Sequence, residues 1–198
     1  ALPDQSLTLA RDRALSPIAG KFMVVGHRGG CRTIDDCGAS ENSLELIRMA
    51  EGLGATAIEV DAQLTQDGVP VLFHDEYLSA RLVNGNYCRG RVVDHTFAHL
   101  RALCTLEFGE PIPTVDDALR VTLEETDLEG VWLDVKEPSA VQPALDLAAK
   151  YSTIAQGSGR KLQIAVGLGT QEVFDAFRKA SHPEGPHCVV ELEPDDVR

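Results

Sequence analysis

The segment GATAIEVDAQLTQDGVPVLFHDE, residues 54–76, places two carboxylates and an imidazole in what otherwise reads as two apolar strands. Strand interiors disfavour charged side chains unless these are paired or bind a metal ion. Because side chains alternate along a strand, Glu59 and Asp61 are expected to share one face. With His74 nearby, this pattern predicts a site for metal-dependent or acid–base chemistry.

The same alternation predicts the orientation of residues in the second apolar run, 69–75. Val71 and Phe73 are expected to face a covering layer of helices. Leu72 and His74 would then face the other way, toward the carboxylates. The turn signal QDG joins this run to the strand before it.

Other predicted strands also end in polar side chains. In 131–136, alternation turns Asp134 and Lys136 to the site face, and His27 closes the run 22–27. The predicted inward set is therefore His27, Glu59, Asp61, His74, Asp134 and Lys136.

This set favours a divalent cation. Three carboxylates that converge without a cation would repel one another, and their pKa values would rise. Oxygen ligands suit Mg²⁺ or Ca²⁺, and Zn²⁺ is less favoured because the two imidazoles fit general acid and base roles. Two alternatives stay open here: Asp134 could pair with Lys136 instead of binding metal, and Lys136 could contact an anionic substrate or be purely structural.

Strand-like and helix-like segments alternate, which predicts an α/β fold with a parallel sheet covered by helices. A doubly wound sheet and a barrel both fit that order. Polar residues at the carboxyl ends of several strands favour a TIM-type (β/α) barrel, since such barrels build their sites there. Six of the eight strands are predicted, so the barrel is expected to be incomplete at the C-terminus: 22–27, 56–61, 69–75, 131–136, 162–168 and 187–193.

Composition bounds the remaining options. The 198 residues, 43% of them hydrophobic, predict one domain, 1–198, with an irregular substrate-side insertion at about 76–113. The net charge of −13, without a basic cluster, argues against nucleic acid and anionic membrane surfaces as partners. No apolar run approaches the roughly 20 residues of a membrane span. A partner chain that completes the barrel is one explanation of the short C-terminus; a fragment is another.

The cysteines and the N-terminus leave the compartment open, cytoplasmic or exported. The N-terminal residues lack an initiator Met and the apolar core of a signal peptide. Cys31 and Cys37 could close a small disulfide loop around CRTIDDC, or all five cysteines could be unpaired thiols.

An ordered set of motifs resembles the glycerophosphodiester phosphodiesterase family of phospholipase-C-like barrels. The match covers about residues 22–150, and the motifs are HRG at 27–29, ENS at 41–43, EVD at 59–61, DG at 67–68, HD at 74–75, PTVDDAL at 113–119 and LDVK at 133–136. Any one of them is weak alone, but their order and placement at predicted strand ends make the set specific.

The resemblance implies a function and a role for each matched residue. The reaction would cleave a glycerophosphodiester to glycerol 3-phosphate and an alcohol, through a cyclic phosphate, with one divalent cation. The implied roles are acid/base catalysis by His27 and His74, metal binding by Glu59, Asp61 and Asp134, phosphate contact by Arg28 and Lys136, and support of the site by Glu41 and Asn42.

Several features depart from this family pattern. Position 134 is usually Glu, the segment between HRGG and ENS is long, and a late strand motif is absent. Asn42, with Glu45 three residues on, also fits the N-cap of a helix that begins at 43.

The competing functions are a non-catalytic barrel that binds metal or a phosphorylated ligand, and a phospholipase-D-like lipid phosphodiesterase.

Overall fold

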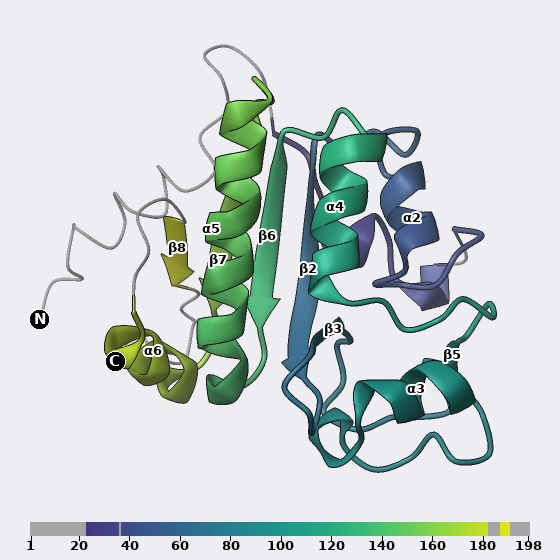
Figure 1. The fold of residues 1–198 in the computed structure, drawn as a ribbon. Coiled ribbons are helices and arrows are strands. Elements are labelled where there is room, and N and C mark those ends of the chain that lie inside the picture. The colour runs from purple at the N-terminus through teal and green to yellow at the C-terminus, as the bar shows by residue number, and fades with distance from the viewer. Residues whose placement is uncertain (1–22, 36, 182–186, 191–198) are drawn as a thin grey trace, which may run out of the picture.

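A parallel sheet forms the centre of the molecule. The computed structural model describes residues 23–35, 37–181 and 187–190. Five parallel strands in these ranges follow the spatial order β1-β2-β6-β7-β8 (Figure 1): β1 (Val25–Gly26), β2 (Ala57–Leu64), β6 (Gly130–Val135), β7 (Gln163–Leu168) and β8 (His187–Val190). Parallel strands require crossover connections, and helices supply them.

One face of the sheet is covered by helices. The helices α4 and α5 lie in front of the sheet in Figure 1, with α2 and α6 beside them: α2 (Leu44–Met49), α4 (Val115–Glu125), α5 (Val141–Gly157) and α6 (Gln171–Lys179). Ile58, Val60 and Leu133 are fully buried in the core between the sheet and these helices. Burying such apolar side chains is the main stabilising contribution to this layer. The alternate residues of β2 and β6 therefore face away from the helices.

The run 69–75 is not a parallel strand, so this part of the predicted topology was wrong. Only β3 (Pro70–Leu72) is extended, and it pairs antiparallel with β2, with Leu72 opposite Ala62. The connection from β2 to β3 is a tight turn with Gly68 at φ 78°, far too short for a parallel crossover. Among the described residues the sheet thus has six strands, but one of them, β3, only extends the end of β2 as a hairpin.

The antiparallel pairing also reverses the predicted faces of this run. Residues opposite each other in a ladder share a face. Leu72 therefore lies with Ala62 in the helix-side core, whereas Val71 and Phe73 belong to a second core. His74 follows the end of β3, so strand alternation does not determine where its side chain points.

The second core lies in the segment that follows β3. It includes Leu82, Leu100 and Ile112, and it packs beyond the carboxyl end of β2 (Figure 1). A disulfide between Cys88 and Cys104 crosslinks it. Its elements are β4 (Val83–Asn84), the short helix η3 (Val92–Asp94), α3 (Phe97–Leu103) and β5 (Thr105–Leu106).

Three further short 3-10 helices complete the described elements: η1 (His27–Gly29), η2 (Thr33–Asp35) and η4 (Pro138–Ala140). Among the described residues, no helix combines the length and apolar character needed to cross a bilayer.

Candidate active site

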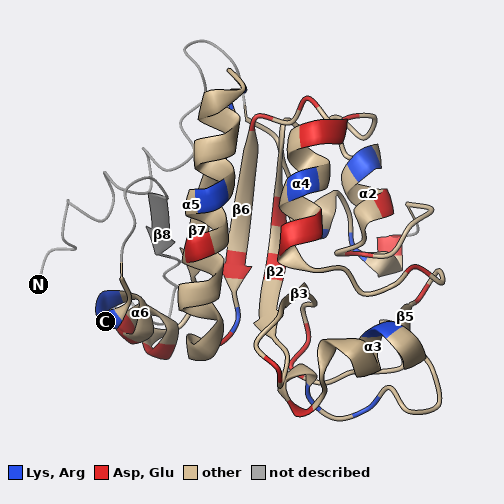
Figure 2. Cartoon of the chain, viewed as in Figure 1, with Lys and Arg blue, Asp and Glu red and all other residues tan. Residues whose placement is uncertain are grey.

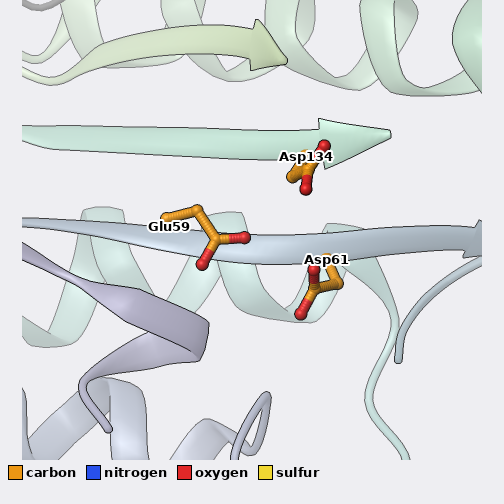
Figure 3. A group of neighbouring side chains, drawn as sticks. All are labelled: Glu59, Asp61 and Asp134. Atoms are coloured by element: carbon orange, nitrogen blue, oxygen red, sulfur yellow. The ribbon is translucent and has the colours of Figure 1, made fainter. Parts of the chain in front are cut away.

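Three acidic side chains converge from two neighbouring strands. Glu59 and Asp61 leave β2 and Asp134 leaves β6, where Asp61 and Asp134 are directly paired in register. One carboxylate oxygen from each residue lies within 4.8 Å of the others. Figure 3 shows these side chains gathered beside the two strands, and Figure 2 shows acidic bands along β2 and at the end of β6. All three carboxylates lie on the sheet face opposite the helices.

The electrostatics of this cluster favour a bound cation. Burial, and then the charges of Asp61 and Asp134, raise the pKa of Glu59 to about 8. Within the described part of the chain, Glu59 Oε1 is buried without a hydrogen-bond partner. An unpartnered buried carboxylate oxygen beside two further carboxylates fits a hard divalent cation with oxygen ligands.

Lys136 partly balances the carboxylates. Its Nζ lies 2.8 Å from Asp61 Oδ1 and 2.5 Å from Asp134 Oδ2. Burial alone would lower the pKa of Lys136, but the charges of Asp61 and Asp134 outweigh it, so the pKa is raised and the ammonium stays charged. The ion pair between Asp134 and Lys136, one of the two alternatives for Asp134, is therefore present. Metal binding by Asp134 and phosphate contact by Lys136 stay predictions.

Arg28 lies in a tight backbone turn over the acidic cluster. It adopts a left-handed conformation with φ 56°. Its backbone N–H donates to Glu59 Oε2 at 2.7 Å, and its Nη1 donates to Glu41 Oε1 at 2.6 Å. The turn needs glycine at Gly26, since a Cβ there would lie 2.9 Å from the Cα of Gly30. The sequence GHRGG, residues 26–30, thus positions Arg28 beside Glu59.

Asn42 holds Asp61 and does not cap the following helix, so the predicted N-cap was wrong. The cap of α2 is Ser43, whose side chain accepts from the N–H of Leu46 at 3.0 Å. The Asn42 amide instead donates to Asp61 Oδ2 at 2.7 Å and accepts from the Asp61 N–H at 3.0 Å. This reciprocal pair fixes the orientation of a fully buried carboxylate.

Glu41 connects Arg28 to the long loop after η1. Its Oε2 accepts from the backbone N–H of Thr33 at 3.0 Å, and its own N–H donates to Thr33 Oγ1 at 2.9 Å. A disulfide between Cys31 and Cys37 closes this loop, which resolves the alternative between a bridge and free thiols. The loop thereby supports the carboxylate that binds the Arg28 guanidinium.

The two predicted catalytic histidines have different partners. His27 Nε2 lies 3.7 Å from Glu59 Oε2, and its side chain is 59% exposed. Burial of part of the ring and the charge of Arg28 lower the pKa of His27. His74 Nδ1 lies 2.8 Å from Asp75 Oδ1 and hydrogen-bonds to it. Neutral imidazoles that exchange protons near pH 7 are suited to acid–base catalysis.

A pocket of about 350 Å³ opens beside His74 and Lys136. Arg91 and Val93, from the segment that holds the second core, line it from the other side. A cavity of this size is within the usual range for small-molecule sites. The geometry thus places a ligand-sized space between the strand ends and that segment.

Sequence reasoning missed three features of this region. Gln63, on the same face as Asp61, hydrogen-bonds to the turn that carries His74, and strand alternation could have indicated it. Arg81 binds Asp75, with both distances 2.9 Å. The Cys88–Cys104 bridge gave no local signal, because its two cysteines are 16 residues apart.

Curated proteins provide the first comparison. The chain is 38% identical to a mouse "Glycerophosphodiester phosphodiesterase 1" over 124 residues, which are 59% of this chain and 34% of the mouse protein. It is 31% identical over 132 residues to a "Glycerophosphodiester phosphodiesterase" from Caldanaerobacter subterraneus, covering 64% of this chain and 50% of that protein. The chain thus matches only a third to a half of the length of these relatives.

Solved structures provide the second comparison. A putative glycerophosphoryl diester phosphodiesterase from Silicibacter pomeroyi superposes with a TM-score of 0.68 at 20% identity, over 94% of this chain and 70% of that one. A phosphodiesterase from Oleispira antarctica, solved in complex with the product sn-glycerol-3-phosphate, gives 0.56 at 20% identity, over 80% and 71%. This likeness confirms the predicted TIM-type α/β barrel class, of which the described strands form an incomplete barrel.

A family model gives the most direct assignment. It is described as the "Glycerophosphoryl diester phosphodiesterase family", and it matches residues 27–143. That range begins at the HRG turn and includes the three carboxylates, both site histidines and Lys136. The chain therefore belongs to the glycerophosphoryl diester phosphodiesterase family.

Proposed function

We propose that this chain carries a phosphoric diester hydrolase activity that converts glycerophosphodiesters to glycerol 3-phosphate and an alcohol. One observation carries the proposal: the carboxylates Glu59, Asp61 and Asp134 converge from β2 and β6, while His27 directly follows the end of β1 and His74 follows the end of β3, where it lines a pocket with Lys136. Barrel enzymes build their active sites at these strand ends. The family membership supports the same reaction.

The three carboxylates would hold one divalent cation, Mg²⁺ or Ca²⁺. Their oxygens lie within 4.8 Å of one another. Burial, and then the charges of Asp61 and Asp134, raise the pKa of Glu59, and a bound cation would offset these charges. Asn42 orients Asp61 through two hydrogen bonds, so one ligand is preorganised. When bound, the cation would neutralise charge that develops on the non-bridging phosphate oxygens.

Arg28 and Lys136 would contact the phosphate. Both are positively charged side chains beside the carboxylates, and Glu41 holds the Arg28 guanidinium at 2.6 Å. Preorganised cations of this kind stabilise a phosphoryl transition state without a cost of reorganisation. Lys136 would keep its charge in this role because its pKa is raised.

His27 and His74 would act as the acid/base pair. One imidazole would take the proton of the glycerol 2-hydroxyl as that oxygen forms a bond to phosphorus. The other would protonate the oxygen of the departing alcohol as its bond to phosphorus breaks. Water would then open the cyclic phosphate by the reverse proton transfers, which gives glycerol 3-phosphate.

The domain arrangement is part of the proposal. Residues 1–198 would form a single barrel-type domain, with residues 76–113 as an insertion on the substrate side. The second core and the Cys88–Cys104 bridge support a compact insertion, and Arg91 and Val93 bring it to the pocket.

The test is release of glycerol 3-phosphate from glycerophosphocholine and glycerophosphoethanolamine, with Mg²⁺, Ca²⁺ or EDTA. We expect release with a divalent cation and loss of release in EDTA. Activity that persists in EDTA would reject the metal role. Folded protein that releases no product with either cation would favour the competing function, a non-catalytic barrel that binds metal or a phosphorylated ligand.

A further inference from the structure

Gln63 lies on the strand that carries two of the acidic residues. It follows Asp61 by two positions on β2, so Glu59, Asp61 and Gln63 share the face opposite the helices. Its side chain is buried, with the residue 5% exposed. A buried amide must satisfy its donors within the protein, which makes its partners informative.

The amide of Gln63 holds three consecutive carbonyl groups. Nε2 lies 3.0 Å from the oxygen of Phe73, 3.3 Å from that of His74 and 2.7 Å from that of Asp75. An amide nitrogen has two hydrogens, so it is shared among these acceptors. These three contacts hold the backbone in place on both sides of His74.

The position of this turn explains why an amide is useful there. β3 ends at Leu72, and the N–H of Phe73 makes a further bond to the oxygen of Asp61 at 3.1 Å. Beyond that point the chain leaves the ladder, and partly buried carbonyls need another donor. Glutamine supplies it without adding charge beside the carboxylate cluster.

The imidazole of His74 is held separately. Its Nδ1 is 2.8 Å from Asp75 Oδ1, and Arg81 Nη2 binds both oxygens of Asp75 at 2.9 Å. Asp75 therefore orients the ring, while Gln63 fixes the backbone from which the ring projects. Gln63 and His74 also line the same pocket of about 350 Å³, together with Lys136.

We propose that Gln63 is a positioning residue for the reaction, because its amide sets the place of His74 at the pocket. This inference rests on the proposed function. Gln63 would act through His74 and make no contact with the reacting atoms. Misplacing a catalytic group by about 1 Å can cost on the order of 10²-fold in rate, so the effect should appear in turnover.

The test compares Gln63→Met with Gln66→Met, a substitution at an exposed glutamine just after the same strand. Methionine keeps the length of the side chain but cannot donate a hydrogen bond. We expect Gln63→Met to lower kcat about 10- to 100-fold with KM changed less than about threefold. Ring ¹H–¹³C NMR signals of His74 should shift or broaden in Gln63→Met only, and the control should match wild type.

Each result decides the matter. A wild-type kcat and unmoved His74 signals in folded Gln63→Met would overturn the inference. If Gln63→Met lowers both Tm and kcat but leaves the His74 NMR signals unmoved, Gln63 has a purely structural role. That result also overturns the inference. If Gln63→Met does not fold, Gln63→Asn keeps the amide and withdraws it by one methylene group, and the same two readouts apply. If wild type releases no glycerol 3-phosphate, the proposed function fails, while the NMR comparison still tests the positioning.

Discussion

The backbone N–H of Asn42 donates to the carbonyl oxygen of Arg28 at 2.7 Å, and these two residues have the positive φ values found among non-glycine residues in the described chain. Such conformations cost free energy and persist where surrounding contacts enforce them. Arg28 binds Glu59 and Glu41, and Asn42 binds Asp61. The unusual backbone thus lies where two segments of the chain are joined to the acidic cluster.

Asn42→Ala should weaken both the fold and cation binding. It removes two hydrogen bonds to Asp61 and leaves a buried carboxylate under-satisfied, which costs about 1–3 kcal/mol. Alanine also tolerates the φ of 60° less well than asparagine. Urea unfolding and calorimetric titration with Mg²⁺ measure both effects. Asn86→Ala, at an exposed turn position, is the control, and equal behaviour of the two variants would contradict the role of Asn42.

The stability of the metal-free protein should depend on pH through Glu59. Its pKa rises from 4.5 in the unfolded chain to about 8 in the folded one. The associated stability is fully present below about pH 4.5 and is lost as pH rises toward 8. In EDTA, we expect the Tm contribution of this group to decline over that window, and Mg²⁺ to restore more stability at pH 8 than at pH 5.

A matched variant isolates this carboxylate. Glu59→Gln carries no titrating group at that position. Between pH 5 and 8, which is about the range over which wild-type Glu59 loses its proton, the Tm of Glu59→Gln should therefore fall less than that of wild type. Parallel pH profiles for the two proteins would show that Glu59 keeps an ordinary pKa.

The two disulfides should have separable effects. Cys88–Cys104 spans 16 residues, so its removal should cost about 3 kcal/mol. Cys31–Cys37 spans only 6 residues, so its removal should cost less stability, but its loop carries Thr33, which binds Glu41. We expect Cys31→Ala/Cys37→Ala to lose more phosphodiesterase activity than Cys88→Ala/Cys104→Ala. We expect Cys88→Ala/Cys104→Ala to lose more free energy of unfolding than Cys31→Ala/Cys37→Ala. Denaturant unfolding and the phosphodiesterase assay, run on both double variants, measure the two effects.

Much of the fold follows from the order and periodicity of the segments. Continuous apolar runs separated by amphipathic helices predict the parallel sheet, and the burial of Ile58 and Val60 agrees with alternation along β2. The run 69–75 was misassigned, because an apolar run does not encode its strand direction. The turn with Gly68 decided it, by returning the chain beside β2.

The sequence also predicts the acidic cluster, because alternation puts Glu59 and Asp61 on one face of a strand, and the observed register puts Asp134 beside them. The sequence does not predict the contacts that support this cluster. Asn42 looked like a helix cap, and only the three-dimensional path of the loop brings it to Asp61. The hydrogen bond from Gln63 to the backbone of His74 likewise depends on where β3 ends.

The central claim is that His27 and His74 perform acid–base catalysis at this site. The most direct measurement is the rate of glycerol 3-phosphate release from glycerophosphoethanolamine with saturating Mg²⁺ or Ca²⁺. It should compare wild type, His27→Ala, His74→Ala and the control His95→Ala, whose ring hydrogen-bonds to the Arg89 carbonyl. We predict losses of about 10²- to 10⁴-fold for His27→Ala and His74→Ala and a near wild-type rate for His95→Ala. Wild-type rates in folded His27→Ala and His74→Ala would contradict the account.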